Sequence, residues 1–405
     1  MELTQLYRSV IGLDVHHNKI SACALITHED GSTDCEFREF GGFKRDRHAL
    51  AEWVSSKQPE QVVMESTGIY WKSPYAALEQ VGIIALVVNA RHVKNVPGRK
   101  TDIGDAQWLA MLARSGLLRG SFVPPANLRS LRLISRQRQK IVGILSGEKN
   151  RLHKVLADSG IRLSAVVSDL HGKTARQLVD GLLLGKTPEE LLALCDTHRL
   201  HASREELLDA LQGDLTPEHV FVGTHLQRHI AILEADIAAF DQRLLDGLGD
   251  YRELLVFLQT LPGVDRVGAA MLLVEIGDDM SVFGSAERLA SWVGLCPGNN
   301  ESAGKKKSGR IRKGNPWLRR LLCEFAQAAA RTRCGLKDKF QALSIRRGRK
   351  RAIVALAHKL LRIVYVLISR REHYRDSTVD YEAQMVANNA PRWFKMLRKH
   401  GFLTA

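Results

Sequence analysis

Four acidic residues near the start of the chain have the types and contexts needed for phosphoryl chemistry. Asp14 ends the apolar run Ile-Gly-Leu-Asp-Val, and Glu65 ends Val-Val-Met-Glu. Asp102 and Asp105 are three residues apart in Lys-Thr-Asp-Ile-Gly-Asp-Ala, so on a helix they would share one face. Carboxylates gathered in this way can hold Mg²⁺ against a phosphodiester, and two ions about 4 Å apart need about this many.

Each of these acids also has an ordinary interpretation. Asp14 could be a solvated carboxylate at a strand end, although an unpaired carboxylate beside apolar residues is costly. Glu65 could cap the following helix, and Asp102 and Asp105 could complement a helix dipole from its first turn. The four acids in this order are more specific than any one of them.

The pattern around the acids predicts an α/β domain. Apolar runs predict strands over 10–15, 19–26, 34–40, 61–65 and 83–88, and helices over 46–56, 69–80 and 102–115. Pro74 must then sit in the first turn of its helix. Three strands followed by alternating helix and strand predict a mixed sheet flanked by helices, a ribonuclease-H-like (RuvC-like) arrangement. In that fold the strand ends and a late helix converge on one carboxylate cluster.

The remaining chain is expected to be mostly helical. Pro124-Pro125 closes the first domain, expected over 1–125, and a helical, coiled-coil-like arm is expected over 126–255. Residues 126–158 form a basic amphipathic pattern, and 225–248 could pack antiparallel to them. A C-terminal domain is expected over 256–375, with helices over 317–330 and 352–369, followed by a peripheral tail over 376–405.

Two glycine-containing segments of the C-terminal domain suggest phosphate contacts. Leu261-Pro262-Gly263-Val264 and the residues after it resemble a helix-hairpin-helix, whose turn amides can contact a phosphate. Residues 299–314 hold six basic residues, three glycines and two serines. The simplest interpretation of 299–314 is a flexible loop that touches backbone phosphates. The basic residues of that loop are Lys305, Lys306, Lys307, Arg310, Arg312 and Lys313.

A second interpretation makes a serine of this loop a nucleophile. A serine hydroxyl is weak at its free pKa, so it needs a metal-bound phosphate, nearby cations and a base. The loop supplies cations, and the N-terminal carboxylates could supply the metal. A further cluster, Arg346-Arg347-Gly348-Arg349-Lys350-Arg351, precedes an apolar helix. Arg346, Arg347 and Arg349 could contact a nucleic-acid backbone at that helix start, or the cluster could be a solvated charge run.

Composition favours a polyanionic partner. The chain has 405 residues and a net charge of +15, and its Lys and Arg surplus could displace counterions from phosphates. The six cysteines are scattered without a C-x-x-C pair, which argues against zinc and disulfides and fits a reducing cytoplasm. The start of the chain lacks a signal-peptide pattern, and its apolar runs are short of a membrane span, so no membrane partner is expected.

At this point the sequence resembles the DEDD transposases of the IS110 (IS110/IS116/IS902-type) family, over nearly its whole length. The four acids, Leu-Pro-Gly-Val and Pro-Gly-Asn-Asn-Glu-Ser-Ala-Gly-Lys carry the resemblance. It implies an RNA-guided serine recombinase that excises and inserts its own element through a phosphoserine intermediate. Asp14, Glu65, Asp102 and Asp105 would bind Mg²⁺. Ser302 would be the nucleophile, with Ser308 as second choice.

The resemblance also implies partners. A structured RNA from the element would select donor and target DNA, and the protein would act as a tetramer, a dimer of dimers. Residues 126–250 would supply dimer contacts, and the bacterial cytoplasm or nucleoid would be the location. Two other hypotheses stay open: a metal-only RuvC-like nuclease or Holliday-junction resolvase that uses water, and a non-catalytic nucleic-acid-binding protein.

Overall fold

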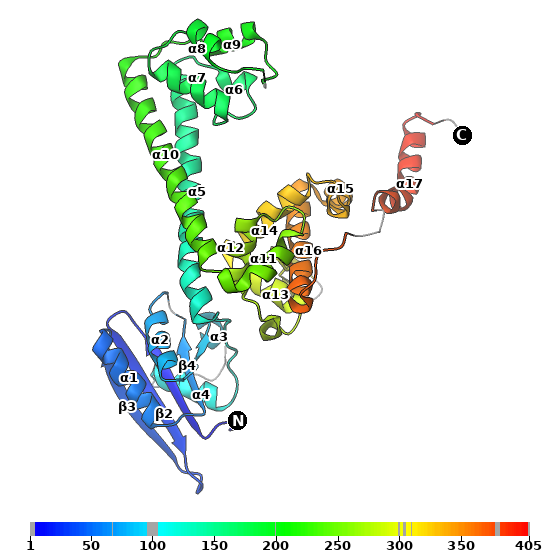
Figure 1. The fold of residues 1–405 in the computed structure, drawn as a ribbon. Helices are drawn as coiled ribbons and strands as arrows, with labels where there is room; N and C mark the ends of the chain where they lie inside the picture. Colours follow the sequence, from blue (N-terminus) through cyan, green and yellow to red (C-terminus); the bar gives the residue numbers. More distant parts are fainter. Residues whose placement is uncertain are drawn as a thin grey trace. The chain divides into compact units, whose positions relative to one another are not determined.

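The structure, a computed structural model, divides the chain into two compact units, Met1–Val123 and Pro124–Ala405. It describes residues 5–66, 68–94, 104–198, 200–298, 300–302, 305–308, 310–376 and 381–403. Figure 1 shows the elements of both units in chain order. The four-part division predicted from the sequence stays a prediction.

The first unit is built around a five-stranded mixed sheet of order β3-β2-β1-β4-β5. The first three strands pair antiparallel, whereas β4 and β5 continue from β1 in parallel. This is the predicted ribonuclease-H-like order of strands. Its described elements are β1 (Ser9–Val15), β2 (Lys19–Thr27), β3 (Thr33–Gly41), α1 (Lys44–Ser56), β4 (Gln61–Glu65), α2 (Lys72–Gln80), β5 (Leu86–Val88), α3 (Ala90–Lys94) and α4 (Asp105–Arg114).

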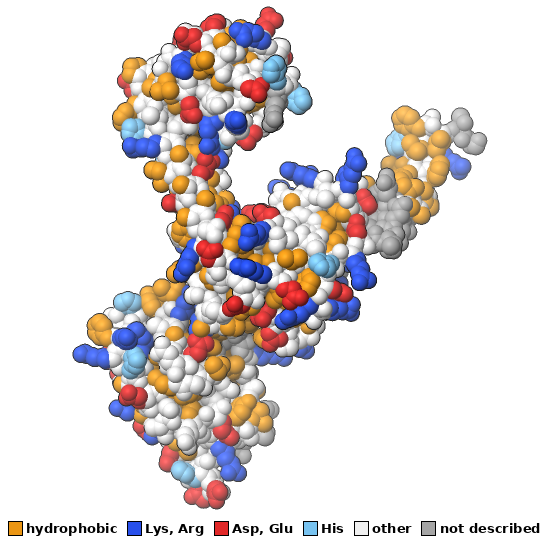
Figure 2. Space-filling model, in the orientation of Figure 1, with side chains coloured by type: hydrophobic (Ala, Val, Ile, Leu, Met, Phe, Trp, Pro, Cys, Tyr) orange, Lys and Arg blue, Asp and Glu red, His pale blue; other side chains and the backbone are white. Residues whose placement is uncertain are grey.

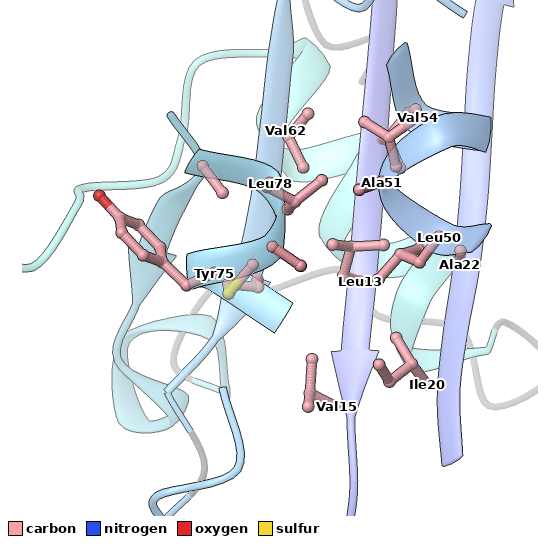
Figure 3. Packing of buried hydrophobic residues seen from close by; sticks show 14 of the residues in the cluster. Leu13, Val15, Ile20, Ala22, Leu50, Ala51, Val54, Val62, Tyr75 and Leu78 are labelled. Carbon is pink, nitrogen blue, oxygen red and sulfur yellow. The ribbon is translucent and has the colours of Figure 1, made fainter. Parts of the chain in front are cut away.

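Strand β1 is apolar on both faces because helices cover both sides of the sheet. On one face, Leu13 and Val15 pack with Leu50 of α1 and Leu78 of α2, as Figure 3 shows. On the other face, alternate residues such as Val10 pack against α4. The central strand is thereby fixed in register, since a slip by one residue would exchange the two faces.

Two predicted elements of this unit are shorter than expected. The strand predicted over 83–88 is confined to Leu86–Val88, and the helix predicted over 69–80 begins at Lys72. Ile83 is drawn into the end of α2, because its N–H donates to the carbonyl of Leu78 at 3.0 Å. Its backbone is therefore not free to join the sheet. Pro74 lies in the first turn of α2, as predicted.

The second unit starts with two long antiparallel helices, α5 (Ala126–Asp158) and α10 (Pro217–Asp246), which lie side by side in Figure 1. Helix α10 begins earlier than the predicted residue 225, because Thr216 caps it and Pro217 occupies its first position. Cross-helix ion pairs join Arg138 with Asp241 and Lys149 with Glu234, and His229 Nδ1 lies 3.4 Å from Glu148 Oε1. Supercoiling of this arm stays a prediction.

Four short helices cover the end of the arm: α6 (Leu163–Val166), α7 (Lys173–Leu183), α8 (Pro188–Leu194) and α9 (Arg204–Leu211). Their apolar residues form one cluster with Leu152 and Leu156 of α5 and Ile230 of α10. Capping boxes start two of them, with Thr187 and Glu190 at α8 and with Ser203 and Glu206 at α9.

The chain then forms a mostly helical domain with one small hairpin. Its elements are η1 (Gly249–Tyr251), α11 (Arg252–Gln259), α12 (Arg266–Ile276), η2 (Met280–Phe283), α13 (Ala286–Val293), β6 (Asn300–Ser302), β7 (Lys305–Ser308), α14 (Pro316–Ala329), α15 (Gly335–Arg347), α16 (Arg349–Arg370) and α17 (Tyr381–Lys399). Helix α16 is buried through residues such as Leu356, Leu360 and Val364 and packs on α13, α14 and α15.

Helix α16 corrects one expectation from the sequence. Among the described residues, Arg349–Arg370 alone is long and apolar enough to cross a membrane, by length and composition only. The apolar runs of the sequence, taken alone, predict no segment of that length. Core helices of folded domains pass the same test, and the packing of α16 against α11, α13, α14 and α15 accounts for its apolar residues.

Candidate functional site

Two of the four acids end adjacent parallel strands. Leu13 of β1 lies opposite Met64 of β4, so the next residues, Asp14 and Glu65, lie side by side; Glu65 is the last residue of β4 and Asp14 the last but one of β1. Leu13 and Met64 both face the α1/α2 side of the sheet. Because side chains alternate along a strand, Asp14 and Glu65 both face the opposite side, which α4 covers.

The third acid reaches this face through a close helix–strand contact. Gly12 lies directly under α4: a Cβ atom on Gly12 would be 2.1 Å from the carbonyl oxygen of Ala106 and 2.6 Å from the nitrogen of Ala110. Only glycine permits the helix backbone to come this close. Asp105, the first residue of α4, immediately precedes Ala106. The start of α4 therefore lies over β1 at Gly12, two residues before Asp14.

Asp14 is the best-defined of these carboxylates. Its side chain is 18% exposed, and His16 Nε2 lies 3.1 Å from its Oδ2 atom. Glu65 is partly exposed and Asp105 is exposed, and both interact with neighbouring groups. Asp102 lies outside the described residues. Oxygen ligands of this kind suit Mg²⁺, but the described side chains by themselves form no group of three ligands around one ion.

Strands β6 and β7, which contain Ser302 and Ser308, form an antiparallel hairpin. The simplest interpretation of the sequence predicted a flexible loop there. Ser302 of β6 pairs with Lys305 of β7 at the turn end, and Asn300 pairs with Ser308 at the base. A register shift follows Asn300. The two candidate nucleophiles therefore occupy opposite ends of one hairpin, so they are not interchangeable in position.

The base of the hairpin is clamped. Gly298 N–H donates to the carbonyl of Arg310 at 2.8 Å, and Pro297 and Ile311 form an isolated bridge. Below that, Gly294 and Gly314 touch: a Cβ on Gly314 would be 2.3 Å from the carbonyl oxygen of Val293. The two chain segments that enter and leave the hairpin are thus held together by backbone contacts.

Glu275 forms a buried charge network that the sequence analysis missed. Its side chain is fully buried. Arg136 donates to both of its oxygens at 2.7 and 2.9 Å, Asn315 Nδ2 donates at 2.6 Å, and Arg132 Nε lies 3.5 Å away. Burial by itself raises the pKa of Glu275, but Arg136, Arg132 and Asn315 outweigh it and lower that pKa. Glu275 therefore stays a carboxylate.

This network connects the arm to the start of α14. Arg132 and Arg136 lie on α5, Glu275 lies on α12, and Asn315 caps α14 by accepting from Trp317 N–H and Leu318 N–H. Asn315 directly follows the segment that leaves the serine hairpin. In the sequence, Arg132 and Arg136 are visible as two arginines one helical turn apart on an amphipathic helix. No neighbouring residue in the sequence indicates that they bind Glu275.

The helix-hairpin-helix-like segment appears as α11 and α12 joined by a short turn, and its glycines have a packing role. A Cβ on Gly263, whose φ is +87°, would be 2.5 Å from the carbonyl oxygen of Phe325 in α14. One on Gly268 would be 2.5 Å from the Phe325 ring. Both glycines therefore let α14 approach the turn. A phosphate contact at the turn stays a prediction.

The second basic cluster differs from its predicted position. Arg346 and Arg347 lie in the last turn of α15, not at a helix start, because Gly348, with φ of +77°, ends that helix. Arg349 starts α16, with its guanidinium 5.8 Å from the centroid of the Phe340 ring. All three arginines are exposed, as are Arg310, Arg312 and Lys313. The side chains of Lys305, Lys306 and Lys307 lie outside what the structure describes.

Charges of both signs are mixed on the visible surface. On the face shown in Figure 2, Lys and Arg side chains of the second unit are interspersed with Asp and Glu. Several basic residues of α5 are also used internally: Arg138 pairs with Asp241 and Lys149 with Glu234. Net charge alone therefore does not define a nucleic-acid interface on this chain.

Comparison with known proteins assigns two separate segments of the chain to the same kind of protein. A family model described as "Transposase" (DEDD, IS110 type) matches residues 11–160, and one described as "Transposase IS116/IS110/IS902 family" matches 256–341. The chain is 26% identical over 333 residues to "Transposase for insertion sequence element IS1111A" of Coxiella burnetii, covering 80% of this chain and 81% of that protein. It is 27% identical over 338 residues to "Probable family 20 transposase" of Pseudomonas aeruginosa, covering 81% and 90%.

The comparison with a solved structure adds little to the family assignment. The RuvC structure of Thermus thermophilus matches 28% of this chain and 99% of its own, with 14% identity and a TM-score of 0.22. The strand order described above carries the fold assignment without it. The two family models, each over the segment that holds one candidate group of residues, define a transposase. The chain belongs to the IS110 (IS116/IS110/IS902) family of transposases.

Proposed function

We propose that this transposase excises and inserts a mobile element by cutting and rejoining DNA through a transient phosphoserine bond. The observation that carries the proposal is the placement of Asp14 and Glu65 on the sheet face that α4 covers, with Asp105 as the first residue of α4. Such a strand-end cluster can present oxygen ligands to Mg²⁺. The family resemblance adds Asp102 to these proposed Mg²⁺ ligands.

Bound Mg²⁺ would polarise the scissile phosphate and stabilise its developing charge. The rest of the reaction is assigned to residues of the chain. The hydroxyl oxygen of Ser302 forms a bond to phosphorus as the phosphorus–oxygen bond to one deoxyribose breaks. The serine proton passes to a base, and the leaving oxygen takes up a proton. One ester bond replaces another, so rejoining requires no ATP.

The family resemblance supports two further parts of the proposal. An RNA encoded by the element guides the choice of donor and target DNA, and the active protein is a tetramer. In that tetramer the carboxylates of one subunit act with Ser302 of another. The hairpin suits this role, because Ser302 lies at its turn end, away from the backbone contacts at its base.

The chemistry is tested by trapping the covalent adduct. Protein, labelled element-end and target DNA and candidate RNA are incubated with Mg²⁺ and then denatured. We expect a protein–DNA adduct that is lost in Ser302→Ala, retained in Ser308→Ala and abolished by EDTA. Free ends without an adduct, unchanged in Ser302→Ala, would show a metal-only nuclease. Binding without cleavage under every condition would show a non-catalytic binding protein.

The shared site is tested by mixing two inactive variants. Asp14→Asn retains the serine, and Ser302→Ala retains the carboxylates. If the site is shared between subunits, the mixture regains the adduct, and the labelled DNA is found on the Asp14→Asn chain. No recovery in tetramers shown to contain both variants would place both groups of residues in the same subunit. Omitting the RNA from the active mixture tests the guide separately.

A further inference from the structure

His17 and Tyr70 form a pair of aromatic rings at the surface of the first unit. Their ring centroids are 5.2 Å apart and their planes make an angle of 82°, which is an edge-to-face contact. Both residues are exposed, and Tyr70 is exposed to 40%. An edge-to-face contact covers at most one face of one ring, so the pair retains ring faces on which another ring could stack.

The pair lies at the same end of the sheet as Asp14 and Glu65. Strands β1 and β4 are parallel, so the segments that follow them leave the sheet at the same edge. His17 lies between β1 and β2, three residues after Asp14, and Tyr70 is five residues after Glu65. Three residues span at most about 11 Å, which is about three stacked nucleotides. A phosphate held by Asp14 would therefore have bases of its own strand within reach of the pair.

The chain around Tyr70 separates aromatic residues that pack inside from those that face solvent. Trp71 packs against the core cluster of the sheet and forms an edge-to-face pair with the buried Tyr75, with centroids 5.8 Å apart. Ile69, in contrast, is 69% exposed. Gly68, with φ of +58°, precedes these residues, and a Cβ on it would be 3.7 Å from two carbons of the Tyr70 ring. Glycine at this position therefore leaves that side of the ring uncovered.

Exposed tyrosine and histidine rings next to a phosphate site suit an unpaired base. Bases stack on such rings, and every base has a π-face, so the contact requires no particular sequence. Bases inside a duplex are already stacked on each other and offer no free face. Because strands that are cut and rejoined must exchange partners, bases next to the cleaved phosphate leave the duplex during the reaction.

We propose that the His17–Tyr70 pair stacks on an unpaired base of the DNA strand that is cleaved, close to the phosphate held at Asp14 and Glu65. Stacking keeps this strand apart from its complement and fixes the position of the phosphate at the carboxylates. The two rings are positioning residues, because they touch a base and not the reacting atoms. This inference rests on the proposed function, since it requires DNA at the carboxylates, but it does not depend on the serine chemistry.

The test combines removal of a base with removal of a ring. The full-length protein and the candidate RNA are mixed with labelled element-end DNA in Ca²⁺, which accepts the same oxygen ligands as Mg²⁺ in a looser geometry. Affinity is measured by fluorescence anisotropy while one abasic nucleotide is moved along the strand. We expect one or two positions where loss of the base weakens binding about 5- to 150-fold, the range for base–aromatic stacking. Equal affinity at every position overturns the proposal.

Tyr70→Ala assigns the sensitive position to the ring. This variant should bind intact DNA more weakly by a similar factor, and the abasic nucleotide at the sensitive position should then weaken binding no further, because both changes remove one contact. Tyr70→Phe keeps the ring and should behave as wild type. The matched control is Phe37→Ala, which removes a 58% exposed ring from β3 and should leave both affinities unchanged.

Two results with these variants overturn the proposal. One is an additive loss in Tyr70→Ala, in which the abasic nucleotide weakens binding as much as it does in wild type. The other is an equal loss of affinity in Tyr70→Phe and Tyr70→Ala. A purely structural role for Tyr70 would produce the additive pattern together with a lower Tm, since a less stable protein would bind every DNA more weakly by the same factor. His17→Ala should show the same coupling to the abasic position as Tyr70→Ala.

Ser302→Ala separates this proposal from the proposed function. Ser302→Ala should retain the coupling between Tyr70 and the abasic position, because it leaves both rings and the carboxylates in place. Coupling in wild type without any covalent adduct would refute the serine chemistry and keep the stacking contact. An adduct in wild type without any such coupling would do the reverse.

Discussion

Asp14 in the first unit and Glu275 in the second show two opposite uses of a carboxylate. Asp14 lies next to the end of the central strand β1 and keeps 18% of its side chain exposed, with His16 beside it. Glu275 is fully buried, and Arg136 and Asn315 donate to its oxygens. A carboxylate saturated by fixed donors holds elements together, whereas one at an accessible strand end can still take a metal.

Burial also affects the arginines around Glu275. Burial lowers the pKa of Arg132 to about 10, although Glu275 acts in the opposite direction. Arg132 therefore still carries its charge at neutral pH. Replacing such a network with apolar residues can be neutral, but removing one partner leaves a buried charge alone. Substitution of Glu275 should therefore mainly lower stability, whereas substitution of Asp14 should mainly lower activity.

The largest expected effect is on stability, at Glu275. In Glu275→Ala, Arg132 and Arg136 lose their buried counter-charge, and we expect unfolding free energy to fall by about 3–5 kcal/mol. Urea denaturation measures this. The matched control is Glu253→Ala, whose exposed carboxylate lies 3.6 Å from Arg371 and should cost less than about 1 kcal/mol. Equal losses in the two variants would remove the contrast between Asp14 and Glu275.

The next effect is on activity, at Asp14. Asp14→Asn keeps the size of the side chain but weakens it as a metal ligand, so we expect DNA cleavage to fall by at least about 10²-fold. Thermal unfolding should change little, because the described partner of Asp14, His16, is itself exposed. Single-turnover cleavage over a range of Mg²⁺ concentrations, together with Tm, would check both parts. A large loss of Tm with normal activity would place Asp14 in the same structural class as Glu275.

Gly12→Ala should have a smaller effect on stability and a clear one on activity. The added Cβ would collide with backbone atoms of Ala106 and Ala110, so α4 must move, at about 1–3 kcal/mol. Asp105 would move with it, and a shift of about 1 Å in a catalytic group can cost about 10²-fold. Cleavage and urea denaturation are the measurements. Gly143→Ala, in open space on α5, is the control and should be neutral or stabilising for the fold.

The smallest effect concerns Glu234, a carboxylate of intermediate exposure on the arm. Arg176 and Lys149 lower its pKa to about 2 from 4.5. A depressed folded pKa stabilises the protein above the unfolded pKa, and that stabilisation is lost as pH falls. Wild type should therefore exceed Glu234→Gln in stability by up to about 1 kcal/mol at pH 7, with the gap closing between pH 4.5 and 2. A gap independent of pH would exclude this charge effect.

Much of the first unit could be predicted from its sequence because its signals are local. Short apolar runs marked β1 and β2, and their order with the later strands predicted the mixed sheet. The positions of Asp14 and Glu65 at strand ends followed directly, because a side chain's place along a strand is fixed by the strand's own pattern. Ile83 was placed wrongly because its backbone is used to end α2 instead of joining the sheet.

The second unit was predictable in outline but not in its contacts. The periodicity of residues 126–158 predicted α5 with its bounds. The same arginines that make α5 look like a basic surface are bound internally, to residues more than 100 positions away, as Arg138 is to Asp241 and Arg136 to Glu275. No local pattern distinguishes an arginine that meets phosphate from one that meets a buried carboxylate.

The sequence by itself determined the elements, the strand ends that carry Asp14 and Glu65, and the presence of a serine among basic residues, because these depend on the periodicity and types of neighbouring residues. Tertiary structure decided which charged side chains are paired inside the protein, such as Glu275 with Arg136, and how closely α4 approaches β1 at Gly12. Those features depend on contacts between distant segments, whose free energy is set by packing and desolvation and not by local pattern.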